Sequence, residues 1–227
     1  MKTYLDLQEG LQDPNIFKAF FLAGGPGSGK SFVVRKTTGG TGLRVVNSDD
    51  AFEHLLKKSG LSLKMPKSEE KPRDVQRKRA KAMTKERKAN YIEGRIGLII
   101  DGTGKEYDKI AKQSIELKQL GYDTHMIFVN TSLDTALERN ANRARSVPED
   151  IVVKSWKEVQ SNIGSFSQHF RQNFIVVDNN DADEDVFVKV FRQIKGLLGK
   201  KVRNPLAMEW IRSEMKSRGI ARAPKGF

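Results

Sequence analysis

Short apolar runs alternate with amphipathic helical segments along this chain. The apolar runs have the length of strands and span residues 16–22, 43–46, 96–100, 124–129 and 174–177. Helical patterns follow them at about residues 31–38, 50–58, 73–93, 106–120, 132–143, 151–159 and 185–197. This alternation is typical of a parallel sheet covered by helices. We therefore predict an α/β fold with a five-stranded, mostly parallel sheet.

Two segments lie outside this regular alternation. Residues 60–93 contain a loop and a long basic helix and form an insertion. Residues 200–227 form a basic helical tail after a main domain of residues 1–199. In the tail, Asn204 can cap a helix, Pro205 suits its first turn and Gly219 suits its end. We expect one face of the tail helix to dock on the domain or on a partner, through Leu206, Trp210, Ile211 and Met215.

Positive charge is concentrated in the same two segments. The formal net charge is +13; residues 67–90 hold ten Lys/Arg and four Asp/Glu, and residues 200–227 hold eight and two. This pattern suits a polyanionic partner such as nucleic acid, although two solvated helices would explain it equally well. The chain has no cysteine, which excludes disulfides, and no apolar stretch long enough to span a membrane. We expect a cytoplasmic protein, its oligomeric state undetermined.

Residues 24–31 read Gly-Gly-Pro-Gly-Ser-Gly-Lys-Ser, which fits the G-x-x-x-x-G-K-[ST] phosphate loop. An apolar run precedes the loop and a helical pattern follows it, as this motif requires. Lys30 is predicted to reach the β- and γ-phosphates of ATP, and the Ser31 hydroxyl to ligate Mg²⁺. We expect Lys30 to be exposed, so that its replacement leaves the fold intact. The predicted nucleotide contacts in the loop are Gly25, Gly27, Ser28, Gly29, Lys30 and Ser31.

Carboxylates follow two further strands. Asp101 ends the apolar run of residues 96–100 in a Walker-B-like pattern and is predicted to hold the metal opposite Ser31. Asp49 and Asp50 follow the second strand, where open α/β sheets place their sites. One of the two can accept a proton from a substrate hydroxyl while the other caps a helix.

Three arginines recur near the end of the helix that begins at Ser132. Arg139 and Arg143 share one helical face, and Arg145 follows before Pro148. We predict an arginine lid over about residues 139–150, closing on the transferred phosphoryl group. A solvated basic face is the alternative.

Together these residues resemble the P-loop kinases grouped around bacteriophage-type polynucleotide 5′-kinase and the zeta toxins, from about residue 20 to 178. The resemblance lies in the phosphate loop, in Val-Asn-Ser-Asp-Asp at residues 46–50, in Asp-Gly-Thr at 101–103, and in Arg-Asn-Ala-Asn-Arg at 139–143 with Val-Pro after it. It implies that Asp49 is the general base and that Arg143 contacts the transferring phosphoryl, with Arg139 beside it. It also implies Asp50 and Thr103 as acceptor contacts and Arg145 as a nucleotide contact.

The chain departs from this group at Phe52, where the family commonly has an arginine that holds the acceptor. The resemblance implies an ATP-dependent kinase that phosphorylates a hydroxyl of a nucleic acid or nucleotide-like substrate. A kinase of a nucleotide sugar or another small hydroxyl compound is the first alternative. A nucleic-acid-binding protein that uses ATP as a conformational switch is the second.

Overall fold

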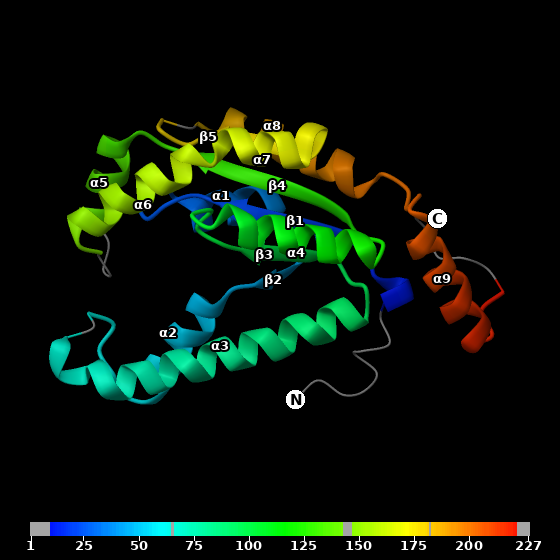
Figure 1. Ribbon diagram of the computed structural model, residues 1–227, viewed down its shortest axis with the longest axis horizontal. Helices are drawn as coiled ribbons and strands as arrows, with labels where there is room; N and C mark the ends of the chain where they lie inside the picture. Colours follow the sequence, from blue (N-terminus) through cyan, green and yellow to red (C-terminus); the bar gives the residue numbers. More distant parts are fainter. Residues whose placement is uncertain (1–9, 65, 143–146, 182, 222–227) are drawn as a thin grey trace.

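The computed structural model describes residues 10–64, 66–142, 147–181 and 183–221 (Figure 1). Its centre is a sheet in the strand order β2-β3-β1-β4-β5, and every neighbouring pair is parallel. This confirms the predicted α/β fold with five parallel strands. The strands are β1 Lys18–Ala23, β2 Arg44–Val46, β3 Leu98–Asp101, β4 Asp123–Asn130 and β5 Phe174–Asp178.

Helices connect the strands. They are α1 Lys30–Thr38, α2 Ser48–Lys58, α3 Glu70–Glu93, α4 Tyr107–Gln119, α5 Leu133–Ala141, α6 Glu149–Ser161, α7 Ile163–Phe170, α8 Glu184–Leu198 and α9 Pro205–Ser217. Helix α7 was not predicted. The helix expected to continue through Arg143 ends at Ala141 instead. Near this end, the Asn140 side chain donates to the Val147 carbonyl and accepts from the Val147 N–H, which holds the last turn of α5 beside the residues before α6.

The two faces of the sheet have separate apolar cores, and β1 contributes to both. Ala19, Phe21 and Ala23 of β1 point to one core, while Phe20 and Leu22 point to the other. This follows from the two-residue side-chain period of a strand. The first core is completed by α4, α6, α7 and α9, and the second by α1 and α8. All six residues of β1 are buried, which fits a central strand.

Helices α2 and α3 form a third, smaller core beside the sheet. Phe52, Leu55 and Leu56 of α2 pack with Ala80 of α3. Figure 1 shows α3 as a long helix running beside α2 and the β2 edge of the sheet. The basic insertion is therefore held against the domain by a few apolar contacts, and most of its surface faces solvent.

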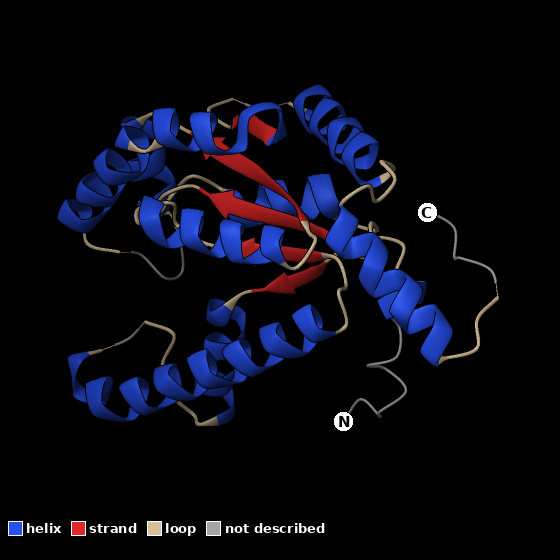
Figure 2. Ribbon diagram, turned by 45° about the vertical axis from the view of Figure 1, so that its right-hand side comes forward, coloured by secondary structure: helices blue, strands red, loops and turns tan. Residues whose placement is uncertain are grey.

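The tail helix α9 docks on the domain at the amino ends of the strands. Ile211 is buried, Ala207 packs against Gly121 just before β4, and the Trp210 ring meets Phe17 edge-on at 5.5 Å between centroids. Leu206 is 49% exposed, so it does not take part in the docking of α9 on the domain. Figure 2 shows α9 at the end of the sheet opposite the strand tips.

Candidate active site at the carboxyl ends of the strands

The phosphate loop forms the turn between β1 and α1. Gly27 and Gly29 have φ angles of +79° and +75°, in the region that favours glycine. A Cβ at Gly27 would overlap the backbone of Ala136, and one at Gly29 would overlap the Asn179 amide. No side chain of the described residues caps α1, so its first N–H groups are available to an anion.

An ion pair joins the loop to the tip of β3. Lys30 Nζ lies 3.0 Å from Asp101 Oδ1, and the two side chains are only 16% and 12% exposed. Asp101 Oδ2 accepts a hydrogen bond from Asn47 Nδ2 at 2.9 Å. The residues meet because β3 pairs with both β1 and β2 and ends level with them. The expectation that Lys30 is exposed is wrong, because Asp101 holds its amine inside the site.

The Asp49–Asp50 pair opens helix α2. Asn47, not an aspartate, is the capping residue, and its side-chain oxygen accepts from the Asp49 N–H at 2.7 Å. Asp49 lies 3.8 Å from a guanidinium nitrogen of Arg77 on α3. Partial burial raises the pKa of Asp50, as do the nearby carboxylates of Asp101 and Asp49. Asp50 thus belongs electrostatically to the Lys30–Asp101 cluster, whereas Asp49 faces the inserted helix.

Arg139 secures the loop after β5 against the phosphate loop. Its guanidinium donates to the carbonyl oxygens of Asn179 at 2.5 Å and Asn180 at 2.6 Å. Asn179 in turn donates to the Ser28 carbonyl at 2.8 Å. Arg139 therefore lies beside the nucleotide loop but engages protein carbonyls. The other two predicted arginines, Arg143 and Arg145, lie outside the described residues, as does the middle of the predicted lid, residues 143–146.

A small pocket with a mixed polar and apolar lining lies beside the end of β3. The Thr103 carbonyl accepts from the Gly24 N–H at 2.9 Å, which ties the Asp-Gly-Thr segment to the phosphate loop. The pocket beside it has a volume of about 140 Å³ and is lined by β1, β3, the following loop and α4, including Asp101, Thr103, Lys109 and Gln113. Thr103 and Asp101 therefore line the same small pocket.

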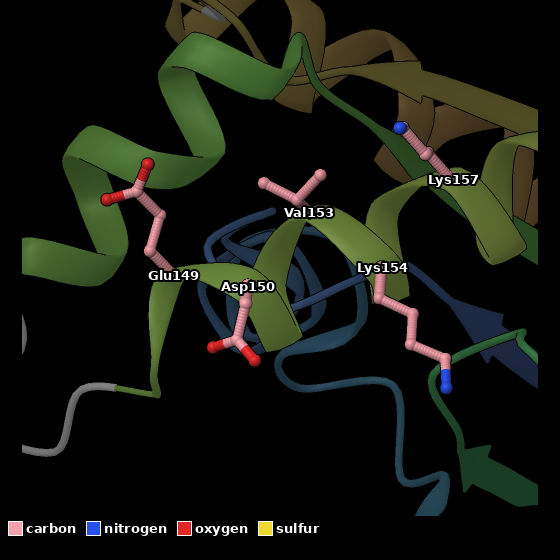
Figure 3. A pocket seen from close by; sticks show the side chains of 5 residues that line it. All are labelled: Glu149, Asp150, Val153, Lys154 and Lys157. Atoms are coloured by element: carbon pink, nitrogen blue, oxygen red, sulfur yellow. The ribbon is translucent and has the colours of Figure 1, made fainter.

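A larger, open hollow of about 630 Å³ lies along helix α6. Figure 3 shows Glu149 and Asp150 at the start of this helix and Lys154 and Lys157 further along it. None of the predicted site residues within the described part of the chain lines this hollow. Its neighbour Ser155 is buried close to Gly25, so α6 forms one wall of the phosphate-loop region. Lys30, Asp101 and Asp50 converge instead at the carboxyl ends of the strands.

Three residues that hold the site together were not predicted. They are Asn47, which links Asp101 to α2; Asn179, which fixes the phosphate loop; and Arg77, which reaches Asp49. Asn47 lies in the Val-Asn-Ser-Asp-Asp segment at residues 46–50, and asparagine is a common helix-capping residue. Its capping role could therefore have been predicted from the sequence. Asn179 carried no local signal, and Arg77 was recognisable only as one of several basic residues of the predicted helix, because only the folded chain brings them to the loop and to α2.

The described residues contain no cluster of three or more His, Asp or Glu side chains that would hold a metal without help. Within the same residues, no helix is both long enough and apolar enough to cross a membrane.

Comparisons with known proteins identify the family. The sequence profile of the zeta toxin family matches residues 2–189. The fold is similar to the structure described as AvrRxo1-ORF1:-ORF2 with ATP, with 16% identity, a TM-score of 0.56, and coverage of 78% of this chain and 59% of the other. It is also similar to a chain of the Pnkp1/Rnl/Hen1 RNA repair complex, with 20% identity, a TM-score of 0.50, and coverage of 67% and 47%. No curated protein matches the sequence. The phosphate loop of this chain is joined to the carboxylate at the end of β3. The chain belongs to the zeta toxin family and is an ATP-dependent kinase with a hydroxyl acceptor.

Proposed function

We propose that this kinase transfers the γ-phosphoryl group of ATP to a hydroxyl of a nucleic acid or nucleotide-like acceptor. One observation carries the proposal: Lys30, Asp101 and Asp50 come together at the carboxyl ends of three adjacent strands, and Asp49 lies next to Asp50 on the side of the inserted helix. Phosphoryl transfer needs a phosphate cradle, a cation on the transferred group and a carboxylate beside the acceptor. These groups are present in one site.

Each residue has a distinct proposed role. Lys30 exchanges Asp101 for the β- and γ-phosphates when ATP binds. Asp49 accepts or orients the proton of the acceptor hydroxyl, and Asp50 contacts the acceptor beside it. Arg143 neutralises charge that develops on the transferred group, with Arg139 next to it and Arg145 on the nucleotide. Arg139 must first release the carbonyls of Asn179 and Asn180 to reach the phosphoryl group, so its role is mainly to position the loop after β5.

The metal proposal fits the residues at the strand tips. Ser31 in the first turn of α1 and Asp101 at the end of β3 would hold Mg²⁺, Asp101 through a water molecule. Asp101 is suited to this because its buried Oδ1 accepts no hydrogen bond from any described residue, although Lys30 lies 3.0 Å away. When bound, Mg²⁺ neutralises phosphate charge and orients the γ-phosphoryl group.

The inserted helix α3 supports a nucleic-acid acceptor. Lys78, Lys81 and Lys85 are exposed on a helix that also supplies Arg77 to the site. A polyanion lying along α3 would therefore reach the Asp49 carboxylate. The basic tail helix α9 is less well placed, because it sits at the opposite end of the sheet (Figure 2).

A second candidate is a kinase of a nucleotide sugar or another small hydroxyl compound. The 140 Å³ pocket beside Asp101 favours it, since a pocket of that size admits one small group and no polymer. A third reading, an ATP switch that binds nucleic acid without a phosphoryl acceptor, has the basic surface of α3 in its favour.

A transfer assay with γ-³²P-labelled ATP separates these candidates. The acceptors to compare are oligonucleotides with 5′-hydroxyl ends, DNA with modified bases, nucleosides and nucleotide sugars. Asp49→Asn and Asp50→Asn form a matched pair: the variant that loses about 10² to 10⁴ in rate while still binding ATP carries the base. An active Asp49→Asn beside an inactive Asp50→Asn would reassign that role to Asp50. If the labelled phosphate is transferred only to water in every reaction, the ATP-switch function is favoured.

A further inference from the structure

Arg77 of the inserted helix reaches into the acceptor side of the site. Its guanidinium carbon lies 4.0 Å from the centroid of the Phe52 ring, and one of its terminal nitrogens lies 3.8 Å from Asp49 Oδ1. These contacts join α3 to the first turns of α2. A cation from a separate element of the fold thus lies beside the carboxylate proposed to activate the acceptor hydroxyl.

The Phe52 ring gives the guanidinium a fixed platform. Phe52 is fully buried among Leu55, Leu56 and Ala80, so the ring has little freedom to move. A guanidinium stacked on an aromatic face keeps its N–H edge available for planar oxyanions. The Arg77 side chain is 35% exposed, so a ligand can reach that edge from solvent.

The present partner of Arg77 is easily exchanged. At 3.8 Å the contact with Asp49 is longer than a hydrogen bond, and the Asp49 side chain is 60% exposed. Exposed ion pairs of this kind contribute little free energy. A phosphate group, in contrast, accepts two parallel hydrogen bonds from one guanidinium. An acceptor phosphate would therefore compete well for Arg77 and leave Asp49 beside the acceptor hydroxyl.

We propose that Arg77 is an acceptor-binding residue that selects substrates with a phosphate group close to the reacting hydroxyl. The inference rests on the proposed function, since it assumes that the acceptor binds between α2, α3 and the strand tips. The chemistry is that of a phosphate ester, either as a free nucleotide or within a polynucleotide. Specificity would thus come from the inserted helix, while the sheet provides the chemistry of transfer.

The first experiment tests anion binding without any assumption about the acceptor. The full chain, labelled with nitrogen-15 and saturated with a non-hydrolysable ATP analogue, is titrated with inorganic phosphate at constant ionic strength. Arg77→Lys assigns the Arg77 Nε–H signal. Arg79 is the internal control, because it is exposed and two residues away, on the opposite face of α3. A saturable shift at Arg77 and none at Arg79 supports the proposal; equal or absent shifts overturn it.

The second experiment tests selection during transfer. Three acceptors offer the same 5′-hydroxyl group but differ in their phosphates. Thymidine has no phosphate, thymidine 3′-monophosphate has a terminal phosphate, and a 5′-hydroxyl oligothymidylate has a chain of phosphates. We expect the phosphate-bearing acceptors to have a lower KM, and Arg77→Gln to remove at least about 10-fold of that advantage with kcat nearly kept. Arg77→Lys should recover little of it, since an ammonium group cannot form the planar double contact. The better of the two phosphate-bearing acceptors identifies the source of the phosphate.

The outcomes distinguish this proposal from the proposed function. If the phosphate preference survives in Arg77→Gln, or falls equally in Arg79→Gln, the inference is wrong while the kinase stands. If Arg77→Gln lowers kcat for all three acceptors alike, Arg77 only positions Asp49. If the wild type phosphorylates none of them, the phosphate titration still decides the role of Arg77.

Discussion

Replacing Lys30 should destabilise the fold as well as remove activity. Asp101 is 12% exposed and has two partners among the described residues, Lys30 at 3.0 Å and Asn47 at 2.9 Å. In Lys30→Ala the largely buried Asp101 carboxylate loses the cation that balances its charge, and leaving a buried charged group without its partner costs about 2 kcal/mol. For a chain of this size that free energy corresponds to a fall of roughly 4–8 °C in Tm.

Thermal unfolding without nucleotide or magnesium measures this effect. Lys36→Ala is the matched control, because Lys36 also pairs at 3.0 Å, with Glu184, but both side chains are well exposed. Its loss should stay within about 0.5 kcal/mol. In an Asp101→Asn background, Lys30→Ala should cost about 1–2 kcal/mol less than in the wild type, because its partner charge is gone.

Two results would refute the reasoning. One is a Lys30→Ala variant that loses no more stability than Lys36→Ala, which would mean that water replaces the amine at no cost. The other is additivity of Lys30→Ala and Asp101→Asn, which would mean that the two side chains do not interact in solution. Phosphoryl transfer should be lost in Lys30→Ala whatever its stability, and retained activity would contradict the proposed site.

Three further predictions concern pH and packing. Burial lowers the pKa of His125 from 6.5 in the unfolded chain to about 4 in the folded protein. As pH falls from 6.5 to 4, the imidazole is therefore protonated in the unfolded chain before it is protonated in the folded protein. Over this pH range the free energy of unfolding should fall by about 3 kcal/mol. Urea titrations at a series of pH values measure this fall, and it should be absent in His125→Phe. Because the pKa of Asp50 is raised in the folded protein, its negative charge opposes folding at pH values above its ordinary pKa of 3.8. Asp50→Asn should therefore stabilise the protein at neutral pH. In the same urea titrations this gain should vanish as the pH is lowered. Ile211→Ala should cost about 2–4 kcal/mol by thermal unfolding and exposed Leu206→Ala under about 0.5, and equal effects would contradict the docking of α9.

The sequence alone determined the fold and the chemistry that is carried by contiguous segments. The phosphate loop needs its glycines, Lys30 and Ser31 at fixed spacing, so the motif is visible without a structure. Strand-length apolar runs predicted all five strands. The signal is strongest for the central strands β3, β1 and β4, because a central parallel strand buries both of its faces. Asp101 could be assigned to the strand beside the loop, and the register of β1 and β3 agrees, with Leu22 opposite Asp101.

Only the tertiary structure decided which separate segments meet. The burial of Lys30 depends on Asp101, which lies 71 positions further along the chain, and the placement of Arg77 depends on the packing of α3 against Phe52. No local pattern encodes either contact. The tail shows the same limit: its apolar face could be read from the sequence, but Leu206 turned outward because Ala207 and Ile211 fit the surface near Gly121 and Phe17. Periodicity identifies the residues that can be buried, whereas the shape of the opposing surface selects those that are.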